Sequence, residues 1–185
     1  EKEFKELTEK KKTVIADKEN ITKLIVDWDA VRVNAITKCW KTVNEDFGKI
    51  FSSILNGASA ELYVPNNGDL IEDGLSIRVG FEGKWKDSLT ELSGGQRSLA
   101  ALSLILALLR FKPAPVYFLD EIDAALDLQH TENIGKMIRT FFKGAQFIAI
   151  SLKAGMFSNA NVLFMTLVKD GMSSVQRKRG NGKDL

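Results

Sequence analysis

The sequence is poor in cysteine, histidine and proline. It contains one cysteine (Cys39), one histidine (His130) and three prolines in 185 residues. A single cysteine excludes an internal disulfide framework and is typical of a reducing compartment. With one histidine, a zinc site built from histidine and cysteine is excluded as well. The longest apolar run, residues 99–109, is interrupted by Ser103 and is too short to span a bilayer.

No charge of one sign dominates. The chain has 26 Lys and Arg against 24 Asp and Glu, a net charge of +2, which neither demands nor excludes a nucleic-acid partner. Its 44% hydrophobic and 27% charged residues are near the globular average, which argues against a disordered chain and a membrane protein. The sequence begins at Glu1 with no initiator methionine and no targeting segment, so we expect a piece of a longer chain.

Residues 1–47 contain neither glycine nor proline, which predicts one long helix or two continuous ones. Apolar residues recur every seven positions from Leu7 to Trp28, and every three or four from Ile36 to Ile54, the pattern of a coiled-coil seam. A single helix would be roughly 75 Å long against roughly 40 Å for a compact chain of this size, so we expect it to project. The alternative is a helix pair folded back near Asn20.

The remainder of the sequence is typical of an α/β lobe. Residues 60–64 and 75–81 alternate apolar and polar side chains, which predicts a small antiparallel element. Residues 98–111 are apolar almost all round and predict a buried helix. Three apolar runs predict buried strands, the first two parallel because a helix intervenes: residues 116–119, 147–150 and 162–165.

Two adjacent acids, Asp120 and Glu121, follow the first of these runs. Open α/β sheets place ligands at the C-terminal ends of their strands, and neighbouring residues of an extended backbone point in different directions. Asp120 is suited to hold Mg²⁺, directly or through water, and Glu121 to orient or deprotonate a water molecule. The alternative is a helix cap beside a surface acid.

A second motif, Leu-Ser-Gly-Gly-Gln-Arg at residues 92–97, opens the apolar helix. The two glycines let another backbone or a phosphate approach closely, and the helix N-terminus adds its positive dipole. Ser93 can cap the helix and offer its hydroxyl. The alternative is an ordinary helix cap, and the role of Arg97 is left open.

Together the two motifs resemble those of ABC-type ATPases. Residues 92–96 resemble the signature motif, residues 116–121 the Walker B strand and residues 124–127 the D-loop. With its long helix the chain resembles the structural-maintenance-of-chromosomes (SMC) family over roughly residues 40–177. Four segments look most like the condensin SMC subunit that binds the N-terminal part of the kleisin: residues 111–115, 120–127, 133–135 and 151–157.

The resemblance implies the C-terminal lobe of an ABC-type ATPase head, an α/β fold with buried parallel strands, a small antiparallel element and a projecting coiled-coil helix. It divides the chain into a neck helix (1–55), the lobe (56–177) and a disordered basic tail (178–185). The Walker A pattern Gly-x-x-x-x-Gly-Lys-Ser/Thr is absent from the sequence. The first implied partner is therefore the N-terminal lobe of the same head, which would supply Walker A.

The resemblance further implies an ATPase that uses ATP and Mg²⁺ in a site shared between two heads. Asp120 would hold Mg²⁺ and Glu121 would polarise the attacking water. The residues implied to bind nucleotide are Ser93, Gly94, Gly95, Gln96, Asp127 and Ser151. For Asp127 the alternative is a cap of the following helix. Ser151 stands where many ABC enzymes carry a switch histidine, which puts a histidine-like sensor in doubt but leaves a hydroxyl able to bind the water.

The other implied partners are a second SMC head, a kleisin at the neck helix and DNA, with no membrane. The expected function is ATP-driven head engagement and hydrolysis in a condensin complex that organises chromosomal DNA in the nucleus. A cohesin or DNA-repair SMC head and a catalytically silent coiled-coil scaffold are alternatives; the long helix disfavours a transporter domain. His130 is expected at the surface, and Cys39 and Trp40 are expected to pack on the seam.

Overall fold

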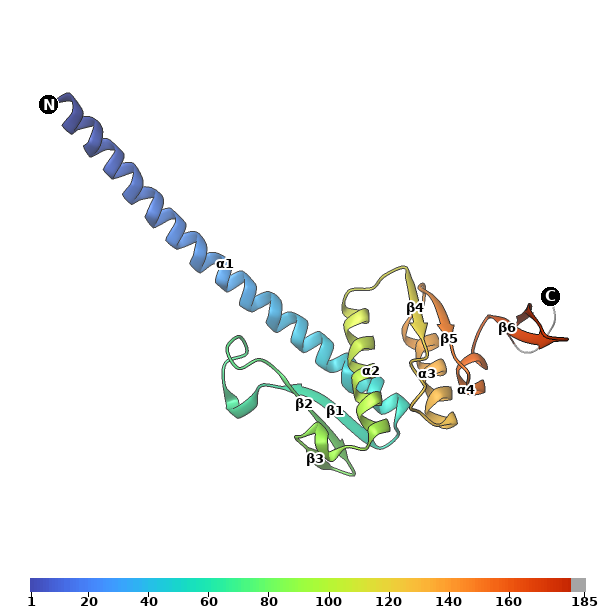
Figure 1. The fold of residues 1–185 in the computed structure, drawn as a ribbon. Helices are drawn as coiled ribbons and strands as arrows, with labels where there is room; N and C mark the ends of the chain where they lie inside the picture. The colour runs from blue at the N-terminus through green and yellow to red at the C-terminus, as the bar shows by residue number, and fades with distance from the viewer. Residues whose placement is uncertain (181–185) are drawn as a thin grey trace. The chain divides into compact units, whose positions relative to one another are not determined.

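The computed structural model describes residues 1–180. The chain divides into two compact units, Glu1–Lys41 and Thr42–Leu185. The first unit consists of helix alone, and the second contains all the strands and the remaining helices (Figure 1). None of the helices over residues 1–180 is long and apolar enough to cross a membrane.

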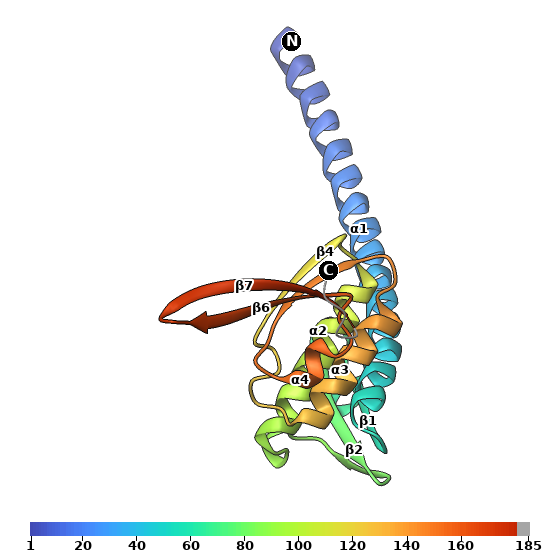
Figure 2. The same cartoon turned by 90° about the vertical axis from the view of Figure 1, so that its right-hand side faces the viewer.

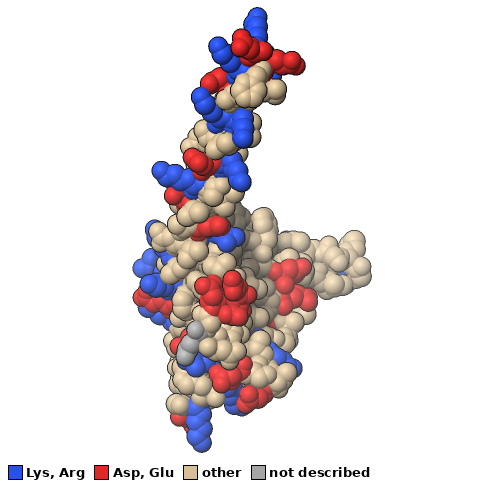
Figure 3. Space-filling model, turned by 90° about the vertical axis from the view of Figure 1, so that its left-hand side faces the viewer, with Lys and Arg blue, Asp and Glu red and all other residues tan. Residues whose placement is uncertain are grey.

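One uninterrupted helix, α1 (Lys2–Ile54), carries the chain from the first unit into the second. It confirms the single long helix and rules out the fold-back near Asn20. Residues 1–36 are all exposed, and the apolar seam from Leu7 to Trp28 is 57–70% exposed. Lys and Arg side chains are interspersed with Asp and Glu along this part of the helix (Figure 3). The N-terminal seam therefore has no partner within the described residues.

The last turns of α1 form part of the core of the second unit. Five apolar side chains of the helix are buried there: Val43, Phe47, Ile50, Phe51 and Ile54. Their spacing of three or four residues, with Phe51 beside Ile50, places them on one helix face. The seam predicted over Ile36–Ile54 is thus a core-packing face from Val43 onward.

A small antiparallel sheet follows, with strands β1 (Ala58–Tyr63), β2 (Ser76–Phe81) and β3 (Lys84–Lys86) in the order β1-β2-β3. It confirms the predicted antiparallel element and adds β3, which the sequence pattern did not reveal. The turn between β2 and β3 is Glu82-Gly83, with φ of 50° and 79°. Two positive φ angles in a two-residue loop are the geometry of a type I′ hairpin. Short 3₁₀ helices occur at η1 (Pro65–Asn67) and η2 (Leu89–Glu91).

Two parallel strands and three helices make up the rest of the lobe core. These elements are α2 (Gly94–Phe111), β4 (Val116–Asp120), α3 (Leu128–Phe141), β5 (Gln146–Ile150) and α4 (Ala154–Phe157). Strands β4 and β5 pair in parallel from Val116↔Gln146 to Asp120↔Ile150, as predicted. Tyr117 anchors β4, because its ring stacks on Phe147 at 4.7 Å between centroids. Both strands end at the same edge, which places Asp120 beside Ile150.

The predicted burial of β4, β5 and α2 is only partly correct. In β4 only Tyr117 is buried, while Phe118 is 75% exposed; β5 has no buried residue. One face of α2 is buried, but Ile105 and Leu108 on its other side are exposed. The physical reason is that parallel strands are normally covered on both faces, whereas the described chain forms only a two-stranded parallel sheet.

The last two strands, β6 (Val162–Lys169) and β7 (Met172–Arg179), form an antiparallel hairpin (Figure 2). The turn is Asp170-Gly171, with φ of 52° and 76°. The run at 162–165 was predicted as a buried strand, but β6 contains no buried residue. The disordered tail predicted over 178–185 is wrong for Lys178 and Arg179, which belong to β7; residues 181–185 lie outside the described residues.

Candidate nucleotide site

The signature segment begins helix α2 through a capping box. The backbone N–H of Gln96 donates to Ser93 Oγ (3.2 Å), and the backbone N–H of Ser93 donates to Gln96 Oε1 (3.0 Å). Arg97 binds within this segment, since its Nη1 donates to the carbonyl of Leu92 (3.0 Å). Ser93 is thus a cap, as predicted, and its hydroxyl hydrogen stays available because its oxygen only accepts in this bond.

The two glycines have no evident structural purpose inside this chain. A Cβ added to Gly94 would meet no atom within 4 Å, and one added to Gly95 would make an ordinary 3.7 Å contact with the carbonyl of Ala125. Neither residue has a positive φ. The capping box also leaves the amides of Gly94 and Gly95 without a hydrogen-bond partner among residues 1–180. Two unpaired amides with open space before them fit an anion that approaches from outside the chain.

Asp120 and Glu121 lie at the exposed C-terminal end of β4, as predicted. Glu121 has a φ of 45°, in the left-handed region that a residue with a Cβ rarely adopts. Its N–H donates to the carbonyl of Ile150 (3.0 Å), which holds the strained backbone against β5. Of the other positive-φ residues with a Cβ, Glu82 and Asp170 lie in hairpin turns and Asn66 lies in η1, whereas Glu121 lies in the connection between a strand and a helix. Strain of this kind is concentrated at functional sites.

Asp127 caps helix α3 and contacts His130. Its Oδ1 accepts from the backbone N–H of His130 (2.9 Å) and lies 2.8 Å from His130 Nδ1. The backbone bond from His130 is the main cause that lowers the pKa of Asp127. The capping alternative for Asp127 is therefore correct in geometry. The expectation for His130 is incomplete, because its half-buried side chain belongs to this cluster.

The signature segment and the D-loop line one hollow, which we call the signature hollow. Its volume is about 240 Å³, and it is lined by Leu55, Ser93, Gly95, Gln96, Leu99, Ala125, Leu126, Asp127 and His130. Asp120, Glu121 and Ser151 do not line it. The structure thus brings Ser93 and Asp127 together and keeps the two acids at a different surface.

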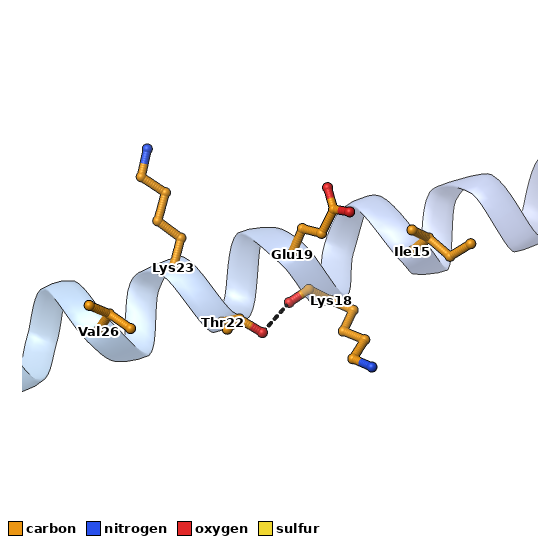
Figure 4. Close-up of a pocket in the computed structure, with 6 residues that line it drawn as sticks. All are labelled: Ile15, Lys18, Glu19, Thr22, Lys23 and Val26. Atoms are coloured by element: carbon orange, nitrogen blue, oxygen red, sulfur yellow. Dashed lines mark hydrogen bonds between the residues drawn. The ribbon is translucent and has the colours of Figure 1, made fainter.

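A larger hollow of about 570 Å³ lies on α1 and is lined by Ile15, Lys18, Glu19, Thr22, Lys23 and Val26. Figure 4 shows that these six side chains all come from one helix and extend from its surface. The only side-chain hydrogen bond between them runs from Thr22 Oγ1 to the carbonyl of Lys18 (2.8 Å), within the helix. The hollow is a feature of an exposed helix surface and holds no convergent polar groups.

Ser151 lies just after β5 and is connected to the D-loop. Its hydroxyl donates to Asp123 Oδ2 at 2.6 Å and accepts from the backbone N–H of Lys153 at 3.0 Å. Asp123 is only 2% exposed. Neither Asp123 nor Lys153 was singled out from the sequence, although both stand within segments that the family resemblance covers. The signal for Asp123 was a third acid three residues after Asp120.

The residues fit a magnesium ion of the kind that binds with a nucleotide. No group of three or more His, Cys, Asp or Glu side chains that could hold a metal exists within residues 1–180. Mg²⁺ in nucleotide sites needs only one or two carboxylates, because water and phosphate oxygens supply its other ligands. The exposed carboxylate of Asp120, which makes no ion pair with the described part of the chain, meets that need.

The fold and the site together define a class. The chain has a helix that starts at Ser-Gly-Gly, then a parallel strand followed by two acids, then a second capped helix. This order is that of the C-terminal lobe of an ABC-type ATPase head. Residues 2–174 match the family model described as RecF/RecN/SMC N terminal domain, and the chain belongs to this family.

Within this family, the chain is similar to structural maintenance of chromosomes proteins of type 2. Over 177 residues, 96% of this chain, it is 58% identical to structural maintenance of chromosomes protein 2-1 of Arabidopsis thaliana and 55% identical to structural maintenance of chromosomes protein 2 of Homo sapiens. The match covers 15% of each relative, so the chain spans less than a sixth of their length.

Solved SMC head structures have the same fold. The Smc head domain of Pyrococcus furiosus, with an extended coiled coil and bound to the C-terminal domain of ScpA, aligns at a TM-score of 0.81 and 32% identity over 94% of this chain and 44% of that chain. A structure reported for ATP-driven dimerization and DNA-stimulated activation of SMC ATPases aligns at 0.70 and 32% identity, over 81% of this chain and 91% of that one.

Proposed function

We propose that this chain is the C-terminal half of an SMC ATPase head that hydrolyses ATP in a site shared among three pieces of protein. The observation that carries the proposal is the division of its polar groups between two surfaces. Asp120 and Glu121 lie at the end of β4, and Ser93 lies with Asp127 in the signature hollow. The sequence has no Walker A of its own. Each surface therefore requires a partner that supplies the phosphates.

The first partner is the N-terminal half of the same head. It would supply Walker A and further strands beside β4 and β5. The exposed apolar side chains of these strands and the segment after them support this, since Phe118 is 75%, Ile150 58% and Leu152 88% exposed. Covering three such side chains contributes roughly 1.5–3 kcal/mol each, which favours a junction between the two halves.

Asp120 and Glu121 act on the nucleotide that this N-terminal half holds. Asp120 would serve as a ligand of Mg²⁺, and the bound ion would offset the negative charge of the phosphates. Glu121 would accept a proton from the attacking water. The left-handed backbone of Glu121, fixed by its bond to Ile150, would hold this carboxylate in one direction. A fixed base costs no reorganisation when the water attacks.

The second partner is another SMC head, whose nucleotide would face the signature hollow. The hydroxyl of Ser93 and the amides of Gly94 and Gly95 would donate to its γ-phosphate. Gln96 would keep these donors in place, because its side chain and N–H complete the capping box. Asp127 also lines the hollow. ATP would then hold two heads together, and hydrolysis would release them.

Ser151 would respond to the nucleotide at the β4 end, in place of a switch histidine. Its position directly after β5 supports this role, because β5 pairs with β4 up to Asp120 and Ile150. The single hydroxyl hydrogen is donated to Asp123 in this structure. Donation to the water or a phosphate would require that hydrogen to be redirected.

The parent protein would be an SMC2-type subunit of a condensin complex that organises chromosomal DNA in the nucleus. The identities of 55–58% to SMC2 proteins support this type over a cohesin or DNA-repair SMC. A kleisin would bind the neck helix α1, whose seam from Leu7 to Trp28 is exposed. The binding of ScpA by the related archaeal head and the DNA-stimulated activation of SMC ATPases are consistent with kleisin and DNA partners.

The experiment that tests the proposal measures nucleotide binding by this chain, by the N-terminal half, and by their mixture. We expect the chain alone to show no ATP binding and the mixture to bind with Mg²⁺ dependence. The mixture should also elute as one species in size-exclusion chromatography. ATP binding by the chain alone at the strength of the mixture would refute the proposal. If the mixture binds ATP but never hydrolyses it even when the second head is added, the silent scaffold would be favoured.

A further inference from the structure

The side chain of Lys153 donates to three backbone carbonyls of one short segment. Its Nζ donates to the carbonyl of Asp123 (2.7 Å), to that of Ala124 (2.9 Å) and to that of Leu126. A lysine ammonium has three hydrogens, so this geometry uses all of them. None of the three acceptors is a carboxylate, and the ion-pair contacts of the described chain do not include Lys153. The ammonium group therefore contacts one short stretch of backbone, residues 123–126.

That stretch is a wall of the signature hollow. Residues 123–127 belong to the connection between the end of β4 and the start of α3, and Ala125, Leu126 and Asp127 line the hollow together with Ser93. The stretch has little regular structure to hold it, since it consists of turns with backbone bonds from Ala124 to Glu121 and from Leu126 to Asp123. The ammonium of Lys153 is thus a main restraint on the position of this wall.

Lys153 also connects this wall to the end of β5. Its backbone N–H donates to Ser151 Oγ (3.0 Å), and the same hydroxyl donates to the buried carboxylate of Asp123 (2.6 Å). The chain therefore closes a ring: Ser151 holds Asp123 by its side chain, and Lys153 holds Asp123 by its carbonyl. Asp123 stands in the sequence between Glu121 and residues 125–127, which line the hollow, and neither Ser151 nor Lys153 lines the hollow.

We propose that Lys153 is a positioning residue for head engagement, because it holds the 123–127 backbone in the conformation that the second head recognises. Ser151 selects that conformation according to whether its hydroxyl donates to Asp123 or to the nucleotide at the end of β4. The inference rests on the function proposed above. Ser151 has one hydroxyl hydrogen and two candidate acceptors, Asp123 and the nucleotide or its water, which gives the ring two discrete arrangements. Lys153 transmits a change at Ser151 to residues 123–126, because its ammonium group donates three hydrogen bonds to that backbone.

The test uses the full-length protein in its complex and compares Lys153→Met, which removes the donors, with Lys153→Arg, which keeps a cation. The matched control is Lys136→Met, since Lys136 pairs with Glu132 on the surface of α3 and touches no backbone carbonyl of the hollow. We expect Lys153→Met to lower kcat for ATP by about 10-fold or more with KM unchanged, because small misplacements of a reacting assembly have effects of this size. Lys153→Arg should restore part of the rate, and Lys136→Met should leave it unchanged.

Two further readouts separate positioning from mere folding. Amide hydrogen exchange over residues 122–127 should become about 10-fold faster in Lys153→Met while the α2 and α3 amides keep their protection. Ser151→Ala should slow hydrolysis in the wild type and add little in the Lys153→Met background, because the two residues act through one ring. Unchanged exchange, an unchanged kcat, or a general loss of protection would each overturn the proposal. A wild type without ATPase activity would instead refute the proposed function, and the exchange result would still decide the role of Lys153.

Discussion

Ser93 has two roles in this account, and substitutions can separate them. It caps α2 through its bond from Gln96, and its hydroxyl would donate to the γ-phosphate on a second head. Ser93→Ala removes both. Loss of an N-cap costs about 1 kcal/mol, which corresponds to a drop of about 0.5 M in the urea midpoint at a slope of about 2 kcal/mol/M. Ser93→Asn keeps a good cap but lacks the hydroxyl, so it should leave that midpoint nearly unchanged.

The ATPase rate should not follow stability in this series. Both Ser93 variants should lose about 100-fold or more in kcat, since Ala removes a preorganised donor to a reacting group and Asn replaces it by an amide NH2 at a different position. Ser88 offers the matched control, because its Oγ caps η2 with a bond of the same length, 3.2 Å from the N–H of Thr90. Ser88→Ala should hydrolyse ATP normally. A Ser93→Asn variant that hydrolyses at the wild-type rate would refute the contact with the γ-phosphate.

Three further predictions concern the catalytic base, the head junction and the core. Glu121→Gln should lower hydrolysis by about 100-fold or more while ATP stays bound and heads stay engaged in cross-linking; normal turnover would show that another group is the base. Phe118→Glu should weaken the association of the two halves in a binding assay without lowering the melting temperature of this chain, whereas Phe4→Glu, at a nearly equal exposure of 76%, should do neither. Ile50→Ala should cost about 2–5 kcal/mol in urea unfolding because the side chain is fully buried, and Val14→Ala should cost far less; equal losses would contradict the boundary of the core.

Patterns that depend on local chemistry were predicted correctly. The absence of glycine and proline up to Phe47 gave the single helix, and the alternation at 75–81 gave β2. The helix between the two apolar runs gave the parallel pairing of β4 with β5. The sequence also contains a signal for two hairpin turns, because Glu82-Gly83 and Asp170-Gly171 both place glycine second in a two-residue loop. They mark the hairpins that contain β3 and β7.

Burial and side-chain partners could not be read from the sequence in the same way. Phe118 and Val162 belong to apolar runs, and a pattern alone cannot tell whether the covering surface lies in the same chain. The ring of Ser151, Asp123 and Lys153 joins residues about 30 positions apart. Only the parallel register of β4 and β5 brings them together. The roles of Asp120, Glu121 and the signature residues remain predictions that the geometry supports and experiment must decide.

The shared site is tested most directly by the rate of ATP hydrolysis per head as a function of head concentration. The heads are assembled from this chain, the N-terminal half and the partner head, without the coiled-coil arms that would tether them. The account predicts that the rate per head rises with concentration and then saturates, and that Ser93→Asn on one head impairs the nucleotide held by the other. A rate per head that is the same at every concentration would contradict it.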